Sequence, residues 1–116
     1  MKHGSNKKTL NMSSSHRQAV YKNLTICFIK NGFVNTTLAK SKVLARKVEK
    51  LITIAKNSNT LETKRMLISR LDKDSQVKLY EIAEKTKNRN GGYTRITKTW
   101  IRYGDGASTA KVELVD

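Results

Sequence analysis

Hydrophobic positions predict four helices in the first three quarters of the chain. In the first of them, apolar residues recur at spacings of four, three and one: Val20, Leu24, Cys27 and Phe28. Such a stripe is typical of one face of an α-helix. Ser15 is a suitable N-cap, Gln18 completes a capping box, and Gly32 suits the end because glycine adopts the left-handed conformation without penalty. We expect the thiol of Cys27 to be buried as a small hydrophobe.

The strongest helical pattern follows a short β-branched segment. Phe33–Thr37 is too short for a helix, and its composition predicts a strand. From about Leu38 to Lys56, one face is apolar while lysine and arginine occupy the rest. The apolar residues are Leu44, Val48, Leu51, Ile52 and Ala55, and the basic ones are Lys40, Lys42, Arg46, Lys47 and Lys50. This pattern predicts a helix that ends at Asn57-Ser58-Asn59.

Two shorter helices are predicted next, each preceded by a capping residue. Asn59 or Thr60 caps the first, and Asp74 caps the second. The apolar positions of the first are Leu61, Leu67, Ile68 and Leu71. In the second, the residues expected to face inward are Val77, Tyr80 and Ala83, with Leu79 and Ile82 as further candidates.

The apolar period changes to two after Gly91-Gly92. Residues 93–103 alternate, with Ile96 and Trp100 among the alternating positions, and Gly104-Asp105-Gly106 supplies a turn. The returning strand alternates at Ala110, Val112 and Leu114. The sequence therefore predicts a C-terminal hairpin, and an edge of that hairpin can pair with Phe33–Thr37, whose backbone groups need partners. The expected fold class is α+β: several helices with a small three-stranded sheet.

The length and the N-terminal composition indicate one domain preceded by an arm. A chain of 116 residues is long enough for one domain and too short for two ordinary ones. Residues 1–14 are basic and rich in Ser and Asn, so alone they bury too little surface to offset their ordering entropy. We expect a basic arm over residues 1–14 and a single globular domain over residues 15–116.

The charge is strongly positive and uneven. The net charge is +15. Residues 1–60 hold 12 basic residues and one acidic residue, while residues 61–116 hold 12 and eight. Such a charge opposes compaction unless a polyanion offsets it, and nucleic acid is the first candidate. An anionic membrane is the other, but no apolar run approaches the ~20 residues of a spanning helix. Residues 1–15 lack the apolar region of a signal peptide, so none is expected there.

Few residues suggest catalysis or metal binding. His3 and His16 could act as acid and base on an RNA 2′-hydroxyl, which would make the chain a small ribonuclease. Catalysis needs fixed geometry, however, and nothing in the arm would fix His3, so we favour phosphate or base-stacking contacts for both histidines. One Cys and two His cannot assemble a zinc site. Several helices followed by a hairpin also describe a winged-helix DNA-binding domain, although no helix concentrates Asn, Gln and Arg on one face.

Basic residues differ in how specifically they indicate a nucleic acid. Those of the arm and the start of the first helix adjoin a helix N-terminus, whose free N–H groups favour a phosphate. These residues are Lys2, Lys7, Lys8, His16 and Arg17. The lysines of the second helix are less specific, because a charged stripe opposite a core face is often merely solvated. On the hairpin, Arg95, Lys98 and Arg102 either follow a nucleic-acid backbone or face water.

Several segments, in order and at compatible spacing, resemble one known family. They are Lys2-His3, Leu10, Ser14–Ala19, Asn23-Leu24, Thr36-Thr37 with Lys40 and Lys42, Leu51–Lys56, Gly91–Ile96 and Glu113–Val115. Together they resemble the bacterial-type large-subunit ribosomal protein seventeen family over effectively the whole chain. The Ser-Ser-His-Arg and Gly-Gly-Tyr-Thr-Arg segments are the specific ones. Met12 stands where the family usually has Arg, Gly4 often replaces a basic residue, and Ala45 occupies a position where Arg is common.

The resemblance implies a non-enzymatic role in the large ribosomal subunit, near the exit of the peptide tunnel. It implies helices with a small three-stranded mixed sheet, no cofactor, and rRNA and neighbouring ribosomal proteins as partners, with no membrane or small-molecule substrate. The location would be the bacterial cytoplasm, or an organellar ribosome. The residues expected to face RNA are Lys2, His3, Lys7, Lys8, His16, Arg17, Asn23, Lys40, Lys42, Thr94 and Arg95. The Gly91-Gly92 turn would let the backbone approach RNA closely.

Overall fold

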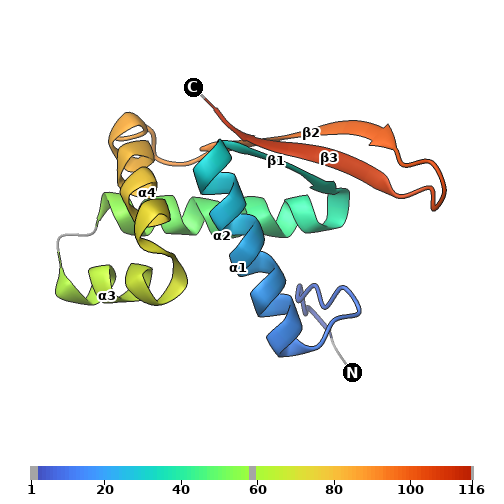
Figure 1. The fold of residues 1–116 in the computed structure, drawn as a ribbon, viewed down its shortest axis with the longest axis horizontal. Helices are drawn as coiled ribbons and strands as arrows, with labels where there is room; N and C mark the ends of the chain where they lie inside the picture. The colour runs from blue at the N-terminus through green and yellow to red at the C-terminus, as the bar shows by residue number, and fades with distance from the viewer. Residues whose placement is uncertain (1–2, 58–59, 116) are drawn as a thin grey trace.

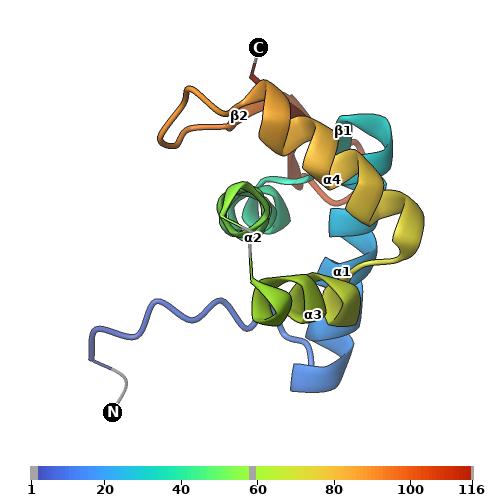
Figure 2. The same ribbon diagram turned by 90° about the vertical axis from the view of Figure 1, so that its left-hand side faces the viewer.

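The computed structural model describes residues 3–57 and 60–115. In these residues the elements follow the order α1 (Ser14–Asn31), β1 (Phe33–Thr37), α2 (Leu38–Lys56), α3 (Leu61–Arg70), α4 (Lys73–Lys85), β2 (Thr94–Ile101) and β3 (Ser108–Leu114). The sheet lies over one side of α2 (Figure 1). Figure 2, which looks nearly along α2, shows α1, α3, α4 and the hairpin arranged around that helix. The predicted α+β class is confirmed.

The core forms where the buried face of α2 meets the other elements. All five apolar residues predicted for this helix are buried: Leu44, Val48, Leu51, Ile52 and Ala55. They pack in one cluster with Phe28 of α1, Leu79 of α4 and Val112 of β3. The predicted bounds of β1 and α2 are confirmed. Gly32 ends α1 as predicted, with a φ of 81° and its N–H donated to the carbonyl oxygen of Phe28.

The three strands form one antiparallel sheet in the order β1-β3-β2. Val34 and Ile96, from the two outer strands, both lie opposite Val112 of β3. The hairpin and its pairing with β1 are therefore confirmed, but the expected mixed sheet is wrong. Strands β1 and β2 do run in the same direction, yet β3 lies between them, so every hydrogen-bonded pair is antiparallel.

Helix α1 differs from its prediction at its cap and its buried face. Ser13, not Ser15, is the N-cap, and its hydroxyl accepts the N–H of His16. The thiol of Cys27 is exposed, not buried. The inward line passes through Tyr21, Thr25 and Phe28, and one residue along a helix turns the side chain by about 100°. Cys27 therefore points away from the core.

The two short helices agree with their predictions in part. Thr60 caps α3, where its side chain accepts the N–H of Thr63, whereas the alternative cap, Asn59, lies outside the described residues. Asp72, not Asp74, is the N-cap of α4, so that Asp74 falls in the first turn. Leu67, Leu71, Leu79 and Ala83 are buried. Leu61, Ile68 and Val77 are exposed, because α3 and α4 pack at the end of the molecule and each has a face that no element covers.

Candidate nucleic-acid interface

A basic groove runs between α1, α2 and α3. Its larger part is a hollow of about 710 Å³, and a smaller part of about 190 Å³ continues it towards the arm. The two parts share lining residues from α1 and α2: Gln18, Tyr21, Val43, Arg46 and Lys47. The two hollows therefore adjoin, and together they form a basic groove lined by segments far apart in the sequence.

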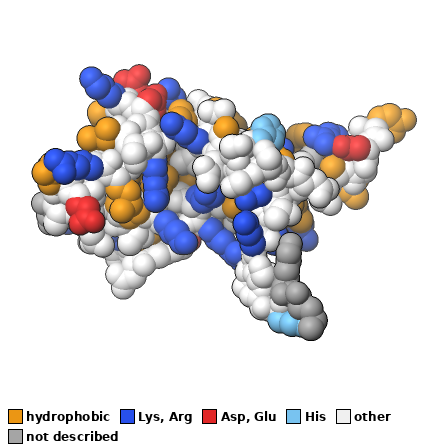
Figure 3. All heavy atoms as spheres, turned by 90° about the horizontal axis from the view of Figure 1, so that it is seen from below, with side chains coloured by type: hydrophobic (Ala, Val, Ile, Leu, Met, Phe, Trp, Pro, Cys, Tyr) orange, Lys and Arg blue, Asp and Glu red, His pale blue; other side chains and the backbone are white. Residues whose placement is uncertain are grey.

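The groove is lined by cations from the arm and from all three helices that border it. They are Lys8 from the arm, Arg17 and Lys22 from α1, Arg46, Lys47 and Lys50 from α2, and Arg70 from α3. No Asp or Glu is among the described residues that line either part. Lys and Arg side chains also gather over the middle of the face shown in Figure 3, whereas acidic side chains lie towards its ends. A groove with one sign of charge concentrates the field of its cations, which favours an anionic ligand.

Tyr21 forms part of the floor of this groove. The residue is only 2% exposed, and the ammonium of Lys47 lies 5.4 Å from the centre of its ring. Burial raises the pKa of the Tyr21 hydroxyl, an effect that nearby Arg17 partly opposes. The hydroxyl is therefore protonated at neutral pH, and the groove keeps its full positive charge.

Arg17 holds the arm against α1. Its Nη1 donates to the carbonyl oxygens of Thr9, at 3.4 Å, and Met12, at 3.2 Å. Residues 9–12 form a turn closed by the Met12 N–H to the Thr9 carbonyl at 3.1 Å, with Leu10 and Asn11 at positive φ. Arg17 thus uses part of its donor set within the protein.

The division into an arm over residues 1–14 and a domain over residues 15–116 stays a prediction.

The other expected contact residues of the N-terminal half are spread over the arm, α1 and the start of α2. His3, Lys7, Lys8, His16, Asn23 and Lys42 are exposed, and Lys40 is half-buried. Lys2 lies outside the described residues. The first turn of α1 contains no acidic residue, which leaves its positive dipole end available to an anion. Of the expected residues, Lys8 and Arg17 line the groove, and whether any of them contacts RNA stays a prediction.

The two residues of the C-terminal half that were expected to contact RNA, Thr94 and Arg95, differ in their contacts within the protein. The Thr94 hydroxyl donates to Glu49 Oε1 at 2.9 Å and so links β2 to α2. Arg95 is exposed. In the Gly91-Gly92 turn, the Gly92 carbonyl accepts from Arg89 Nη1 at 3.3 Å, and Gly92 has a φ of 64°.

Most of the cations that line the groove are not among the residues expected from the sequence to contact RNA. Helical periodicity places Arg46, Lys47 and Lys50 on a face that is often merely solvated, and it does not single out Lys22 or Arg70. One signal in the sequence does point to the three cations of α2, because Glu49 is the single acidic residue of that helix. The groove itself cannot be found from the sequence, since it exists only where three helices meet.

Neither a metal centre nor a membrane span is found within the described residues. No group of three or more His, Cys, Asp or Glu in residues 3–57 and 60–115 is placed to hold a metal ion. None of the helices in those residues is long and apolar enough to cross a membrane. A basic groove on a small α+β fold is typical of proteins that bind a polyanion.

Comparison with known proteins identifies the family. The family model described as "Ribosomal protein L17" matches residues 20–115. The large ribosomal subunit protein bL17 of Campylobacter concisus is 47% identical over 116 residues, covering 99% of this chain and 98% of the relative. The bL17 proteins of Wolbachia pipientis wMel and Bradyrhizobium diazoefficiens are 47% and 43% identical, and each covers 100% of this chain. The matches extend over 84% and 85% of those two relatives.

The chain belongs to the ribosomal protein L17 family. The members of this family are structural proteins of the ribosome and are not enzymes. The resemblance read from the sequence motifs is therefore confirmed, and so is the non-enzymatic assignment. The ribonuclease and winged-helix alternatives are set aside.

Proposed function

We propose that this chain binds and stabilises large-subunit rRNA through phosphate and shape contacts, as a structural constituent of a bacterial cytoplasmic ribosome. The observation that carries the proposal is the basic groove, in which cations from three helices and the arm converge without a carboxylate among the described lining residues. Cations held in one groove release several counterions from a single stretch of phosphate backbone. Membership in the family supports the ribosomal setting.

The groove and the arm have complementary roles in this proposal. RNA helices are recognised mostly by shape and by contacts to phosphate and 2′-hydroxyl groups. The groove would hold one backbone segment, while the arm, anchored by Arg17, would extend along neighbouring rRNA with His3, Lys7 and Lys8. A site near the exit of the peptide tunnel, beside other ribosomal proteins, belongs to the same proposal.

Two charge-matched variants test the groove. The groove variant combines Arg46→Gln, Lys47→Gln and Lys50→Gln. The control combines Lys64→Gln, Lys73→Gln and Lys87→Gln, three exposed cations outside the groove. Binding to protein-free large-subunit rRNA is measured between about 50 and 200 mM salt, a range over which several phosphate contacts change affinity strongly.

The slope of log K against log salt distinguishes the outcomes. We expect the groove variant to lose about 2 to 3 units of slope, roughly one for each lost phosphate contact, and the control to lose less than one. Equal losses in the two variants would show that overall charge, and not the groove, binds RNA. Wild-type protein that does not bind rRNA would refute the proposed function.

A further inference from the structure

The tip of the β2–β3 hairpin presents apolar side chains that no other element covers. Trp100 is 65% exposed, Ile101 is 72% exposed and Tyr103 is fully exposed. In Figure 1 the hairpin extends past the end of α2, so the sheet has no helix beneath it there. The pairing of β2 with β3 is also irregular between Lys98 and Ile101. Large apolar side chains left exposed close together in the chain are candidates for an interaction site.

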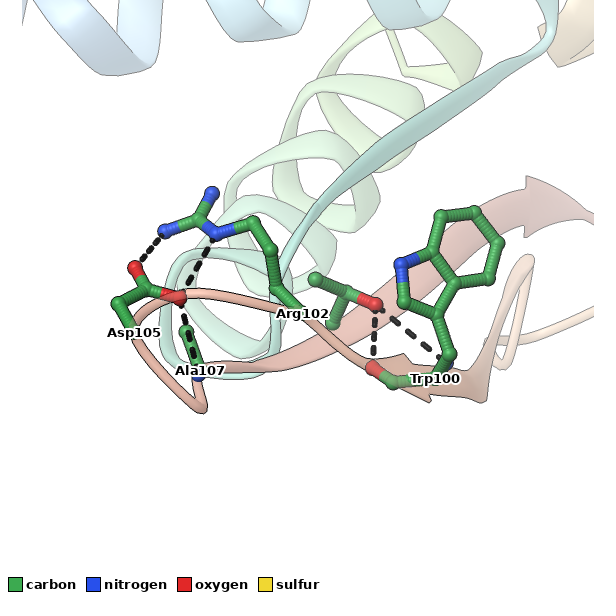
Figure 4. A network of polar contacts seen from close by, with 5 residues as sticks. Trp100, Arg102, Asp105 and Ala107 are labelled. Atoms are coloured by element: carbon green, nitrogen blue, oxygen red, sulfur yellow. Dashed lines mark hydrogen bonds and ion pairs between the residues drawn. The ribbon is translucent and has the colours of Figure 1, made fainter.

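Hydrogen bonds hold the backbone of the tip in one arrangement. The Thr109 hydroxyl donates to the Trp100 carbonyl at 2.6 Å, and the Trp100 N–H donates to the oxygen of the same hydroxyl at 3.4 Å. The Arg102 guanidinium binds both carboxylate oxygens of Asp105, at 3.1 and 2.5 Å, and the Ala107 N–H donates to the same carboxylate at 3.1 Å (Figure 4). A tip ordered in advance loses less conformational entropy when it binds.

The charge of the tip differs from that of the rest of the chain. Residues 99–110 contain one basic and one acidic residue, Arg102 and Asp105, and these two form an ion pair. The net charge of +15 therefore lies entirely in the other residues. A surface that binds RNA needs free cations to displace the counterions of the phosphates, and Arg102, the one cation within residues 99–110, is already paired. The aliphatic side chain of Ile101 offers a base no stacking surface either.

We propose that this tip docks into an apolar, uncharged cleft of a neighbouring protein in the large subunit. Trp and Tyr are among the residues that contribute most to protein–protein binding, and Trp100 and Tyr103 both lie exposed at this tip. The tip would bind a protein while the basic groove binds rRNA, so the two surfaces act separately. This inference rests on the proposed function, because that function supplies the ribosomal setting.

A double variant, Trp100→Ser with Tyr103→Ser, tests the docking surface. The matched control, Ile68→Ser with Val77→Ser, removes two apolar side chains of similar exposure, 61% and 60%, from α3 and α4. Each variant is measured in two assays. The first is affinity for protein-free rRNA. The second is competition with wild-type protein for large-subunit particles that lack this protein and retain their other proteins.

We expect the tip variant to bind protein-free rRNA within twofold of wild type and to lose at least tenfold in the competition assay. The control should match wild type in both. Equal losses in the two assays would show that the tip stacks on RNA, and no loss in either would show that it binds nothing. Both results overturn the inference. Wild-type protein that binds neither rRNA nor particles refutes the proposed function, and the inference with it.

A photo-crosslinking side chain in place of Tyr103 gives a second, independent measurement. Inside assembled subunits, we expect its crosslinks to fall on a single ribosomal protein. Crosslinks to rRNA nucleotides would overturn the inference even if the competition assay supported it. The same crosslinking group is placed at Thr97, an exposed residue of β2 outside the tip. This control shows which crosslinks form with whatever component happens to lie near the hairpin.

Discussion

Two buried tyrosines show how much the surroundings of one hydroxyl group matter. The hydroxyl of Tyr93 accepts a hydrogen bond from Lys56 Nζ at 2.9 Å and donates to the Arg89 carbonyl at 3.0 Å. The Lys56 ammonium also lies 5.0 Å from the centre of the Tyr93 ring. The hydroxyl of Tyr21 is buried and has no hydrogen-bond partner among the described residues. A buried polar group without a partner costs about 1 to 3 kcal/mol.

Replacing each tyrosine by phenylalanine should therefore change stability in opposite directions. We expect Tyr21→Phe to raise the free energy of unfolding by about 1 kcal/mol, because it removes an unpaired buried hydroxyl. Tyr93→Phe, the matched control, should lower it by about 1 to 2 kcal/mol, because it leaves Lys56 and the Arg89 carbonyl with one bond fewer each. Urea denaturation measures both. Destabilisation by Tyr21→Phe would show that its hydroxyl is hydrogen-bonded in solution.

At the scale of elements, polar contacts join the end of α1 to the start of α4. Lys30, in the last turn of α1, forms an ion pair of 2.8 Å with Asp72, the N-cap of α4. Lys78 Nζ donates to the Lys30 carbonyl at 2.9 Å. A cation at a helix C-terminus and an anion at a helix N-terminus each complement the dipole of their helix. The hydrogen bond from Lys30 lowers the pKa of Asp72 to about 2 and raises that of Lys30.

This ion pair predicts a pH dependence of stability. Because the pKa of Asp72 is lower in the folded state than its ordinary 3.8, its contribution is present above about pH 4 and is lost as the pH falls towards 2. Asp72→Asn keeps a good N-cap and removes the charge. We expect this variant to be less stable than wild type at pH 7 and the stability difference to narrow between about pH 4 and 2. Thermal unfolding at several pH values measures it.

Lys30→Gln is the control for that experiment, since it removes the other partner of the pair. The same narrowing should appear with Lys30→Gln, although the exposure of both side chains, 40% and 42%, keeps the effect small. A stability difference that stays constant over this pH range would contradict the assignment.

For the whole molecule, the distribution of charge matters more than any single pair. The net charge is +15, and the groove gathers seven cations from the arm and three helices. Like charges held this close repel one another, which destabilises the folded state when no polyanion is bound. The groove is thus costly for the free protein, and the same repulsion is relieved by an anionic ligand.

Screening should therefore stabilise the free protein. Between about 0.1 and 1 M salt the Debye length falls from roughly 10 to 3 Å, so we expect the melting temperature to rise by several degrees in NaCl. The groove variant with glutamine at positions 46, 47 and 50 should melt higher at low salt and respond less to salt. The control with glutamine at 64, 73 and 87 should stay close to wild type. An equal response from all three proteins would count against repulsion within the groove.

Local sequence determined the elements of this protein and much of its core. The bounds of β1 and α2, the glycine that ends α1 and the C-terminal hairpin follow from period, capping and turn residues, which act between neighbours along the chain. The buried face of α2 likewise follows from the spacing of Leu44, Val48 and Leu51. The strongly basic charge and the short family motifs indicate a ribosomal protein from the amino-acid sequence alone.

Only the tertiary structure decided which faces are covered and which side chains meet. Periodicity assigned Cys27, Leu61 and Ile68 to the apolar faces of their helices. Whether each side chain is buried depends on whether another element packs over it, and among the described residues no element does. The central position of β3 made the sheet antiparallel throughout, and the length of the hairpin left Trp100 and Tyr103 uncovered. The groove depends on the angles at which three helices pack. Such contacts form between residues far apart in the chain, so no local pattern determines them.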